Sequence, residues 1–189
     1  MVKRLLLLTS SIILLTTACG RFRQINYEEL TGKVREILEV PTFEQVYRDI
    51  IYYGEEKKLL AIKVVDKRLL FSVDVVVKAG IDFTEGLEVL PGDNADSVTL
   101  VLPHAKILLI DADEASIHQY FVKNRGGDIT LLDYYNEIDR TKERIRQDAL
   151  NRGILFKAEE NAVKLLRKFF GFAGFTDVEF EFKESGAAP

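Results

Sequence analysis

The chain has 189 residues, of which 47% are hydrophobic and 30% are charged, and only 4 are proline. This balance is that of an ordinary globular domain, and it excludes a collagen-like chain, a disordered tail and a polytopic membrane protein. The formal net charge of −4 argues against a nucleic-acid-binding protein, which needs a basic face to neutralise phosphates. We therefore expect one domain that binds no nucleic acid.

The first 18 residues have the layout of a signal peptide. Lys3 and Arg4 precede an uncharged stretch, residues 5–18. As a helix this stretch would be about 21 Å long, which is shorter than the roughly 30 Å hydrocarbon core of a bilayer. It leads into Leu15-Thr16-Thr17-Ala18-Cys19-Gly20, which resembles a bacterial lipobox, where a small residue precedes a cysteine that is lipidated.

Cys19 is the only cysteine, so an intrachain disulfide and a multi-cysteine zinc site are both excluded. Its thiolate is a nucleophile that can take a diacylglycerol, and two or more acyl chains, such as palmitate, give stable anchoring in a membrane. The sequence thus predicts residues 1–18 as signal peptide and 19–33 as lipidated cysteine and tether. An ordinary cleaved signal, or an uncleaved anchor with an incidental cysteine, is the alternative.

Alternating hydrophobicity after the tether predicts an antiparallel sheet of about five short strands. The clearest alternation places Phe71, Val73, Val75 and Val77 on one face of a half-buried strand. Turns are expected between the strands, at 54–57, 66–67 and 91–94.

The hydrophobic period changes after residue 130, where a 4-3 spacing predicts one long helix. Its stripe consists of Leu131, Tyr135, Ile138, Ile145, Ala149, Phe156, Val163, Leu166 and Phe170. The stripe keeps its phase across Gly153, which favours a continuous or gently kinked helix over two helices. A last strand is expected at 178–182 and a flexible tail at 183–189, so residues 34–182 form a single α+β domain with the helix packed on the sheet.

Four short motifs in this domain resemble landmarks of the bacterial domain of unknown function 4230 family. They are Val77-Lys78-Ala79-Gly80-Ile81-Asp82-Phe83, Val98-Thr99-Leu100-Val101-Leu102-Pro103, the run from Gly153 to Ala162, and Gly174-Phe175. Their order and spacing carry the resemblance, which covers residues 34–182. It implies an envelope-associated domain that follows a membrane or lipoprotein segment, and it supplies no catalytic residue.

Three carboxylates are the candidate ligand-binding residues: Asp82, Asp111 and Asp113. Asp82 follows Gly80, where an aspartate more often bonds to its own turn than to a ligand. Asp111 and Asp113 superficially resemble a cation loop, yet the glycine and distal glutamate of such a loop do not follow. A strand exit with acids at a helix N-terminus is the simpler interpretation.

Other motifs predict no chemistry. His104 and His118 lack a second ligand nearby and are interpreted as a loop residue and a surface helix residue. Gly126-Gly127-Asp128 lacks the lysine and serine of a phosphate loop, so it is expected to be a link before the helix. The aromatic run 169–175 either pins the helix end into the core or contacts a bilayer or a partner. No metal or cofactor is predicted.

These features favour a lipid-anchored envelope protein that faces the periplasm or exterior and acts as a binding or scaffolding module without catalysis. Its predicted partners are membrane lipid, through acylated Cys19, and an envelope protein or a second copy. One alternative is a hydrolase-like envelope enzyme whose acids come from separate segments, with Asp82 and Asp111 the first to test. A second alternative is a scaffold that self-associates through the long helix.

Overall fold

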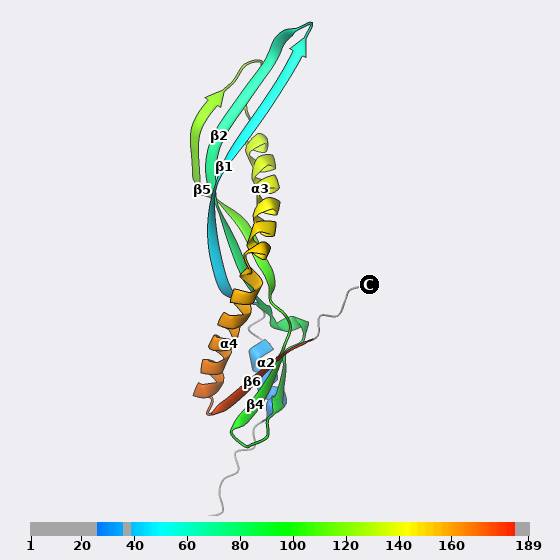
Figure 1. Ribbon diagram of the computed structural model, residues 1–189, viewed down its shortest axis with the longest axis vertical. Coiled ribbons are helices and arrows are strands. Elements are labelled where there is room, and N and C mark those ends of the chain that lie inside the picture. Colours follow the sequence, from blue (N-terminus) through cyan, green and yellow to red (C-terminus); the bar gives the residue numbers. More distant parts are fainter. Residues whose placement is uncertain (1–25, 36–38, 184–189) are drawn as a thin grey trace, which may run out of the picture.

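Two long β-strands, with two helices packed along one side of them, give the molecule an elongated α+β fold (Figure 1). The computed structural model describes residues 26–35 and 39–183. The elements in chain order are α2 (Tyr27–Arg35), β1 (Glu39–Leu59), β2 (Ile62–Asp82), the 3-10 turn η1 (Phe83–Glu85), β3 (Glu88–Pro91), β4 (Ser97–Leu102), β5 (Lys106–Lys123), α3 (Leu131–Asn151), α4 (Ile154–Phe172) and β6 (Asp177–Phe182).

The larger sheet is antiparallel, with strand order β1-β2-β5. The predicted buried face of β2 is confirmed, since Phe71, Val73, Val75 and Val77 are each 0% exposed. Helices α3 and α4 pack against this face, and the opposite face of the sheet carries no helix among the described residues (Figure 1). The core therefore lies between the two helices and one side of this sheet, and it continues to β4, where Val98, Leu100 and Leu102 are buried in the same cluster.

The prediction of about five short strands is wrong, because β1 and β2 each run for 21 residues. The turns expected at 54–57 and 66–67 lie inside these strands, and the chain reverses at Leu60-Ala61 instead. Ion pairs explain how polar residues are tolerated there: Lys63 binds Glu56 at 2.6 Å, and Arg68 binds Asp66 at 2.9 Å. At about 3.3 Å per residue, each long strand spans roughly 65 Å.

A second, smaller sheet has the order β3-β4-β6 and forms the end of the molecule opposite the β1–β2 turn (Figure 1). β3 and β4 are antiparallel, but β4 and β6 are parallel, which the prediction of one antiparallel sheet did not include. The parallel pair is possible because α4 lies between the two strands in the chain. The helix carries the chain back, so that β6 can start beside β4 and run in the same direction. Helix α2, which includes residues 27–33 of the expected tether, packs against β3 and η1.

The predicted single helix is two helices, and its stripe is confirmed only in part: Leu166 and Phe170 are buried as predicted, whereas Leu131 is exposed. Gly153 has a φ of 72°, in the left-handed region, and ends α3. In α3 the buried side chains are Ile138, Thr141, Ile145 and Ala149. In α4 they are Ile154, Ala158, Ala162, Leu166 and Phe170, so the buried face has changed phase. Phe156, a member of the predicted stripe, is 65% exposed.

Candidate functional site

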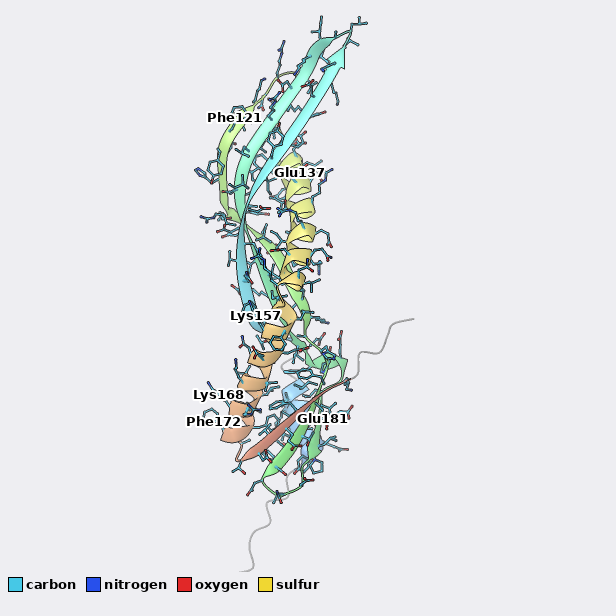
Figure 2. All side chains as sticks on the ribbon, viewed as in Figure 1. Phe121, Glu137, Lys157, Lys168, Phe172 and Glu181 are labelled. Carbon is cyan, nitrogen blue, oxygen red and sulfur yellow. The ribbon has the colours of Figure 1, made fainter. Side chains whose placement is uncertain are left out.

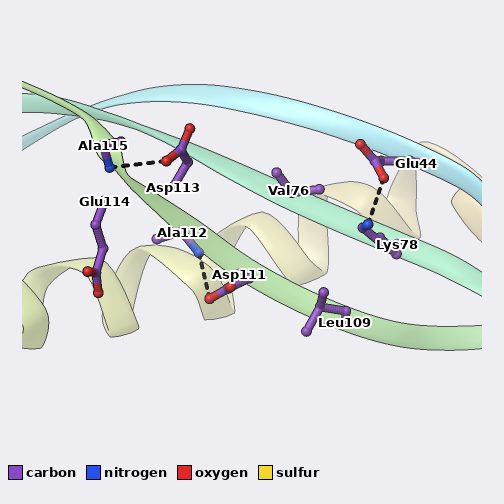
Figure 3. A pocket seen from close by; sticks show the side chains of 9 residues that line it. All are labelled: Glu44, Val76, Lys78, Leu109, Asp111, Ala112, Asp113, Glu114 and Ala115. Atoms are coloured by element: carbon purple, nitrogen blue, oxygen red, sulfur yellow. Dashed lines mark hydrogen bonds and ion pairs between the residues drawn. The ribbon is translucent and has the colours of Figure 1, made fainter.

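Asp111 and Asp113 line an open depression on the helix-free face of the larger sheet (Figure 3). It measures about 620 Å³ and also contains Glu44, Lys78 and Glu114. Lys78 Nζ lies 3.0 Å from Glu44 Oε2, so the one lysine in the lining is already paired across β1 and β2. The depression is thus an exposed, net acidic surface at the middle of the sheet.

An irregularity in β5 creates this depression. Asp113 pairs with Asp74, while His118 pairs with Ser72, so β5 has extra residues between these positions. Asp113 Oδ1 accepts a hydrogen bond from the N–H of Ala115 at 3.0 Å, and Ser116 Oγ accepts one from the N–H of Asp74 at 2.7 Å. The side chains of Asp113 and Ser116 therefore satisfy backbone groups that the bulge leaves without strand partners.

The interpretation of Asp111 and Asp113 as a strand exit before a helix is wrong, because both lie within β5. Asp111 Oδ1 accepts a hydrogen bond from the N–H of Ala112 at 3.0 Å, and Lys142 of α3 lies 3.5 Å from it. Both acids stay in register with β2, where Asp111 pairs with Val76 and Asp113 with Asp74, and the 18-residue strand continues because the extra residues after Asp113 form a bulge.

Asp82 is buried and fully engaged at the other end of β2. Its Oδ1 accepts hydrogen bonds from the Thr84 backbone N–H at 2.9 Å and from Thr84 Oγ1 at 2.6 Å. Its Oδ2 accepts one from Lys106 Nζ at 2.7 Å, and Lys106 also lies 2.8 Å from Glu85. Lys106 and the Thr84 donors lower the pKa of Asp82 to about 2. The predicted role of Asp82 in its own turn is confirmed.

The structure does not bring the three candidate acids together. Asp111 pairs with Val76, six residues before Asp82 along β2, so the two acids are separated by about 20 Å of strand. Asp111 and Asp113 share the depression, whereas Asp82 caps η1. A pair of carboxylates that works on one bond needs a separation below about 10 Å, and Asp82 and Asp111 do not meet it.

The histidines lie apart from these acids. His104 is in the loop after β4, as predicted, and its Nδ1 is 2.9 Å from Glu159 Oε1. His118 lies on β5, not on a surface helix, and its ring contacts that of Tyr120 with centroids 4.7 Å apart. Within residues 26–35 and 39–183, no group of three or more His, Cys, Asp or Glu side chains could hold a metal ion.

The aromatic run at the end of α4 faces two ways. Phe170 and Phe175 are buried with ring centroids 5.8 Å apart, which is the predicted pinning of the helix end. Phe172 is 92% exposed and Phe169 is 42% exposed, so they point outward. Figure 2 shows Phe172 beside Lys168 at the end of the helix. Half of the run serves the core and half is available at the surface.

Two features escaped the sequence-based reasoning. Asp66 is buried and pairs with both Arg68 and Lys123, which joins β2 to the end of β5. These partners lower its pKa, Lys123 most of all. The exposed turn Leu60-Ala61 is the other, since neither residue type indicates a turn. The alternating charges around Asp66 were the sequence signal for its ion pairs. The run of lysines beside leucines was the sequence signal for the exposed turn.

Cys19 lies outside the described residues. In the part of the chain that the structure describes, no helix combines the length and hydrophobicity needed to cross a bilayer.

The motifs that carry the family resemblance all have architectural roles. Gly153 separates α3 from α4, and Ala158 and Ala162, both almost fully buried, let α4 approach the sheet closely. Asn161 Nδ2 donates a hydrogen bond to the carbonyl of Thr42 on β1 at 3.0 Å, and Thr42 Oγ1 donates one to the carbonyl of Ala158 at 2.6 Å. These contacts fasten α4 to β1.

The remaining motif residues are structural as well. Leu102 and Pro103 are buried at the end of β4, and Asp82 caps η1. Gly174 has a φ of 102°, which lets the chain leave α4 so that Phe175 can pack against Phe170. The shared landmarks thus specify how the fold is assembled.

Comparison with known proteins agrees with the resemblance. No curated protein and no solved structure gives a significant match to the chain. A family model, described as a protein of unknown function (DUF4230), matches residues 32–180, from within α2 to within β6. The chain therefore belongs to the DUF4230 family.

Proposed function

We propose that this chain is a lipoprotein that holds an elongated, non-catalytic binding module at the extracytoplasmic face of a bacterial membrane. The observation that carries the proposal is the position of the single cysteine, Cys19, directly after a short apolar segment and a small residue. Acylation of this thiol would fix the N-terminal side of the module to the lipid bilayer.

An exposed apolar stripe on α4 supports the membrane side of this proposal. Leu165, Phe169 and Phe172 follow one another at spacings of four and three residues, so they lie on one helix face. Lys164 and Lys168 lie next to them in the sequence. An apolar stripe with flanking lysines is typical of a helix that contacts the headgroup region of a bilayer.

The place of this stripe in the molecule is consistent with a lipid anchor. α4 contacts β6, and α2, where the first described residues lie, contacts β3 of the same small sheet. Cys19 precedes Asn26 by seven residues, which span at most about 25 Å of chain. A membrane that held Cys19 would therefore lie within reach of the end of α4.

The contacts of the acids support a module without catalysis. Asp82 is neutralised by Lys106 and satisfied by Thr84. Asp111 and Asp113 lie on an open surface, and Asp113 serves the bulge of β5. A general acid or base needs an enclosed site that tunes its pKa toward the working pH, and the pKa of Asp82 is shifted the other way.

Replacement of Cys19 by alanine tests the anchor. The Cys19→Ala variant should leave the membrane fraction and lose incorporation of labelled palmitate, because no other cysteine is present to be acylated. Fractionation of cells and the intact mass of the purified protein are the measurements. A Thr17→Ser variant, which keeps Cys19, is the control and should remain acylated. An unmodified protein that starts at Met1 would contradict the proposal.

A further inference from the structure

The turn that joins β1 and β2 carries an exposed apolar cluster at the end of the molecule. We call residues 57–64 the hairpin tip. Leu60 is 91% exposed, and Leu59 and Ile62 are 65% and 66% exposed. Side chains of this size are rarely left in water as a contiguous group unless another surface covers them.

The backbone of the tip is strained. Leu60 and Ala61 have φ values of 48° and 67°, and both belong to the left-handed region that non-glycine residues seldom adopt. A two-residue hairpin turn of this kind favours Asn-Gly, which relieves the strain. The protein has a leucine and an alanine there instead. The turn is therefore less stable than one with Asn-Gly, and in exchange it presents an apolar side chain at its end.

The tip extends past the rest of the sheet (Figure 1). The last pair of β2 with β5 is Arg68 with Lys123, and the loop after β5 adds one bond, from the Asp66 N–H to the Arg125 carbonyl at 2.9 Å. Gly126 of this loop also lies against the backbone of Val64, and from Val64 to Ala61 the hairpin continues alone for about 10 Å. A two-stranded ribbon is only marginally stable in water, so this projection gains most from a surface that covers it.

The charge of this end is opposite to that of the whole chain. Residues 55–68 contain five basic and three acidic side chains, whereas the chain has a net charge of −4. Lys57 pairs with Glu55 and Lys58 with Glu56, and Lys63 shares the same Glu56. Lys67 and Arg68 pair with Glu55 and Asp66 further from the turn, so residues 55–63 keep an excess of one positive charge around Leu59, Leu60 and Ile62.

Exposed apolar side chains flanked by lysines match the chemistry of an anionic bilayer surface. Acyl chains receive the apolar side chains, and the negative surface potential attracts the lysines. The tip lies one long strand, about 65 Å, from η1 and α2. Because Cys19 can be no more than about 25 Å of chain from Asn26, the membrane that holds the N-terminal segment and the tip lie at opposite ends of an upright molecule.

We propose that the hairpin tip inserts Leu59, Leu60 and Ile62 into the headgroup region of an anionic bilayer other than the one that holds the N-terminal segment. The recognition chemistry is apolar side chains plus lysines against anionic lipid headgroups. The proposal rests on the proposed membrane attachment of the N-terminal segment, but the contact of the tip itself needs no acyl group.

A single tryptophan can report this contact, because the chain contains none. The intact Leu59→Trp protein is reconstituted into donor vesicles through its N-terminal segment and mixed with acceptor vesicles whose phosphatidylglycerol is brominated. Phe156→Trp is the matched control, since Phe156 is also 65% exposed but lies on α4, far from the tip. We expect bromine to quench the tryptophan of Leu59→Trp and not that of Phe156→Trp.

A second variant separates loss of contact from loss of folding. Leu60→Asn combined with Ala61→Gly supplies the favoured turn residues, so the hairpin should be more stable. The variant should nevertheless capture acceptor vesicles about tenfold less well or worse, which is the loss expected when one leucine is no longer buried. Capture by the natural sequence should also fall as salt screens the lysines.

Three results would overturn the proposal. They are no quenching in Leu59→Trp, quenching only when the brominated lipid is in the donor vesicles, and undiminished capture by the Leu60→Asn, Ala61→Gly variant. A tip that binds a protein instead of lipid gives the first of these results. Recovery of the protein with the donor vesicles shows separately that the N-terminal attachment is intact.

Discussion

At the scale of single residues, the side chains that stand out as candidate sites have structural partners. Asp82 shows this most clearly, because each of its carboxylate oxygens accepts from a side chain and Oδ1 also accepts from a backbone N–H. A carboxylate with this many donors favours its charged form. Its role is to hold η1 and the start of β5 against the end of β2.

Asp82→Asn should destabilise the protein in a pH-dependent way. The pKa of Asp82 is about 2 in the folded protein, below its ordinary value of 3.8, so the carboxylate stabilises the fold above about pH 4. That contribution is lost as the pH falls from about 4 to 2. Thermal unfolding should therefore show a lower Tm for Asp82→Asn at pH 7 and a difference that shrinks toward pH 2.

Asp93→Asn is the control for this measurement, since Asp93 is exposed in the turn between β3 and β4. Its Tm should stay close to that of the natural sequence at each pH. An Asp82→Asn variant with an unchanged Tm at pH 7 would show that the Lys106 and Thr84 contacts do not stabilise the fold.

At the scale of elements, Gly153 determines how the C-terminal half packs. Its left-handed conformation ends α3 and starts α4, so the second helix presents Ile154, Ala158 and Ala162 to the sheet. A continuous helix would have turned Phe156, which is exposed, toward the core. The break therefore places two alanines where α4 crosses β1, at the contact with Thr42.

Gly153→Ala should destabilise the protein by about 1–2 kcal/mol, the cost of a left-handed conformation for a residue with a Cβ. Apart from its neighbours in the chain, no described residue has a heavy atom within 4 Å of the position that the new Cβ would take, so the effect isolates the backbone. Gly171→Ala is the matched control, because Gly171 is helical and also has nothing within 4 Å.

Urea unfolding of the two variants gives the comparison. Gly171→Ala should stabilise the protein by up to about 1 kcal/mol, because alanine is the better helix former. Equal effects of the two substitutions would show that Gly153 does not need its left-handed conformation.

The sequence predicts local patterns in this fold better than it predicts the lengths of the strands or the contacts between distant residues. The alternation of Phe71, Val73, Val75 and Val77 correctly identifies a strand and its buried face, because burial of one face leaves a period of two. The true length of β2 is hidden, since Asp66 and Lys67 resemble a turn until the partners Arg68 and Lys123 are known. These partners come from the fold and not from neighbouring residues alone.

The candidate site shows the same division. The turn role of Asp82 is predictable because its partner Thr84 is two residues away. The place of Asp113 beside a bulge is not predictable, since it depends on the register between β5 and β2. The spacing of the helix stripe is also misleading. Apolar residues on both sides of Gly153 keep a 4-3 spacing in the sequence, which is typical of one helix, but the left-handed conformation of Gly153 ends the first helix all the same.

At the scale of the whole molecule, the length of the β1–β2 hairpin is the dominant property. A compact chain of 189 residues would have a radius of gyration of about 16 Å. A sphere with this radius of gyration is about 41 Å across, whereas each 21-residue strand spans roughly 65 Å and is only partly covered by the helices (Figure 1). The fold is thus elongated, with the β1–β2 turn at one end and the small sheet at the other (Figure 1).

A distance between spin labels tests this shape. Labels at Pro41→Cys and Leu60→Cys, in a Cys19→Ala background that contains no other cysteine, lie near the two ends of β1. Electron paramagnetic resonance on the detergent-solubilised chain should give a separation of about 60 Å, as 19 residues of extended strand require. A distribution below about 40 Å would show that the hairpin folds back on the helices.

Because neither helix nor third strand accompanies the hairpin to its end, its reach can change independently of the core. Adding one residue to each of β1 and β2 near the turn would lengthen the projection by about 3.3 Å, and adding two to each keeps every side chain on its original face. The ribbon is in effect a ruler graduated in steps of about 7 Å. Insertion or deletion of such steps would give proteins with a longer or shorter projection, with the glycine break, the bulge and the small sheet unchanged.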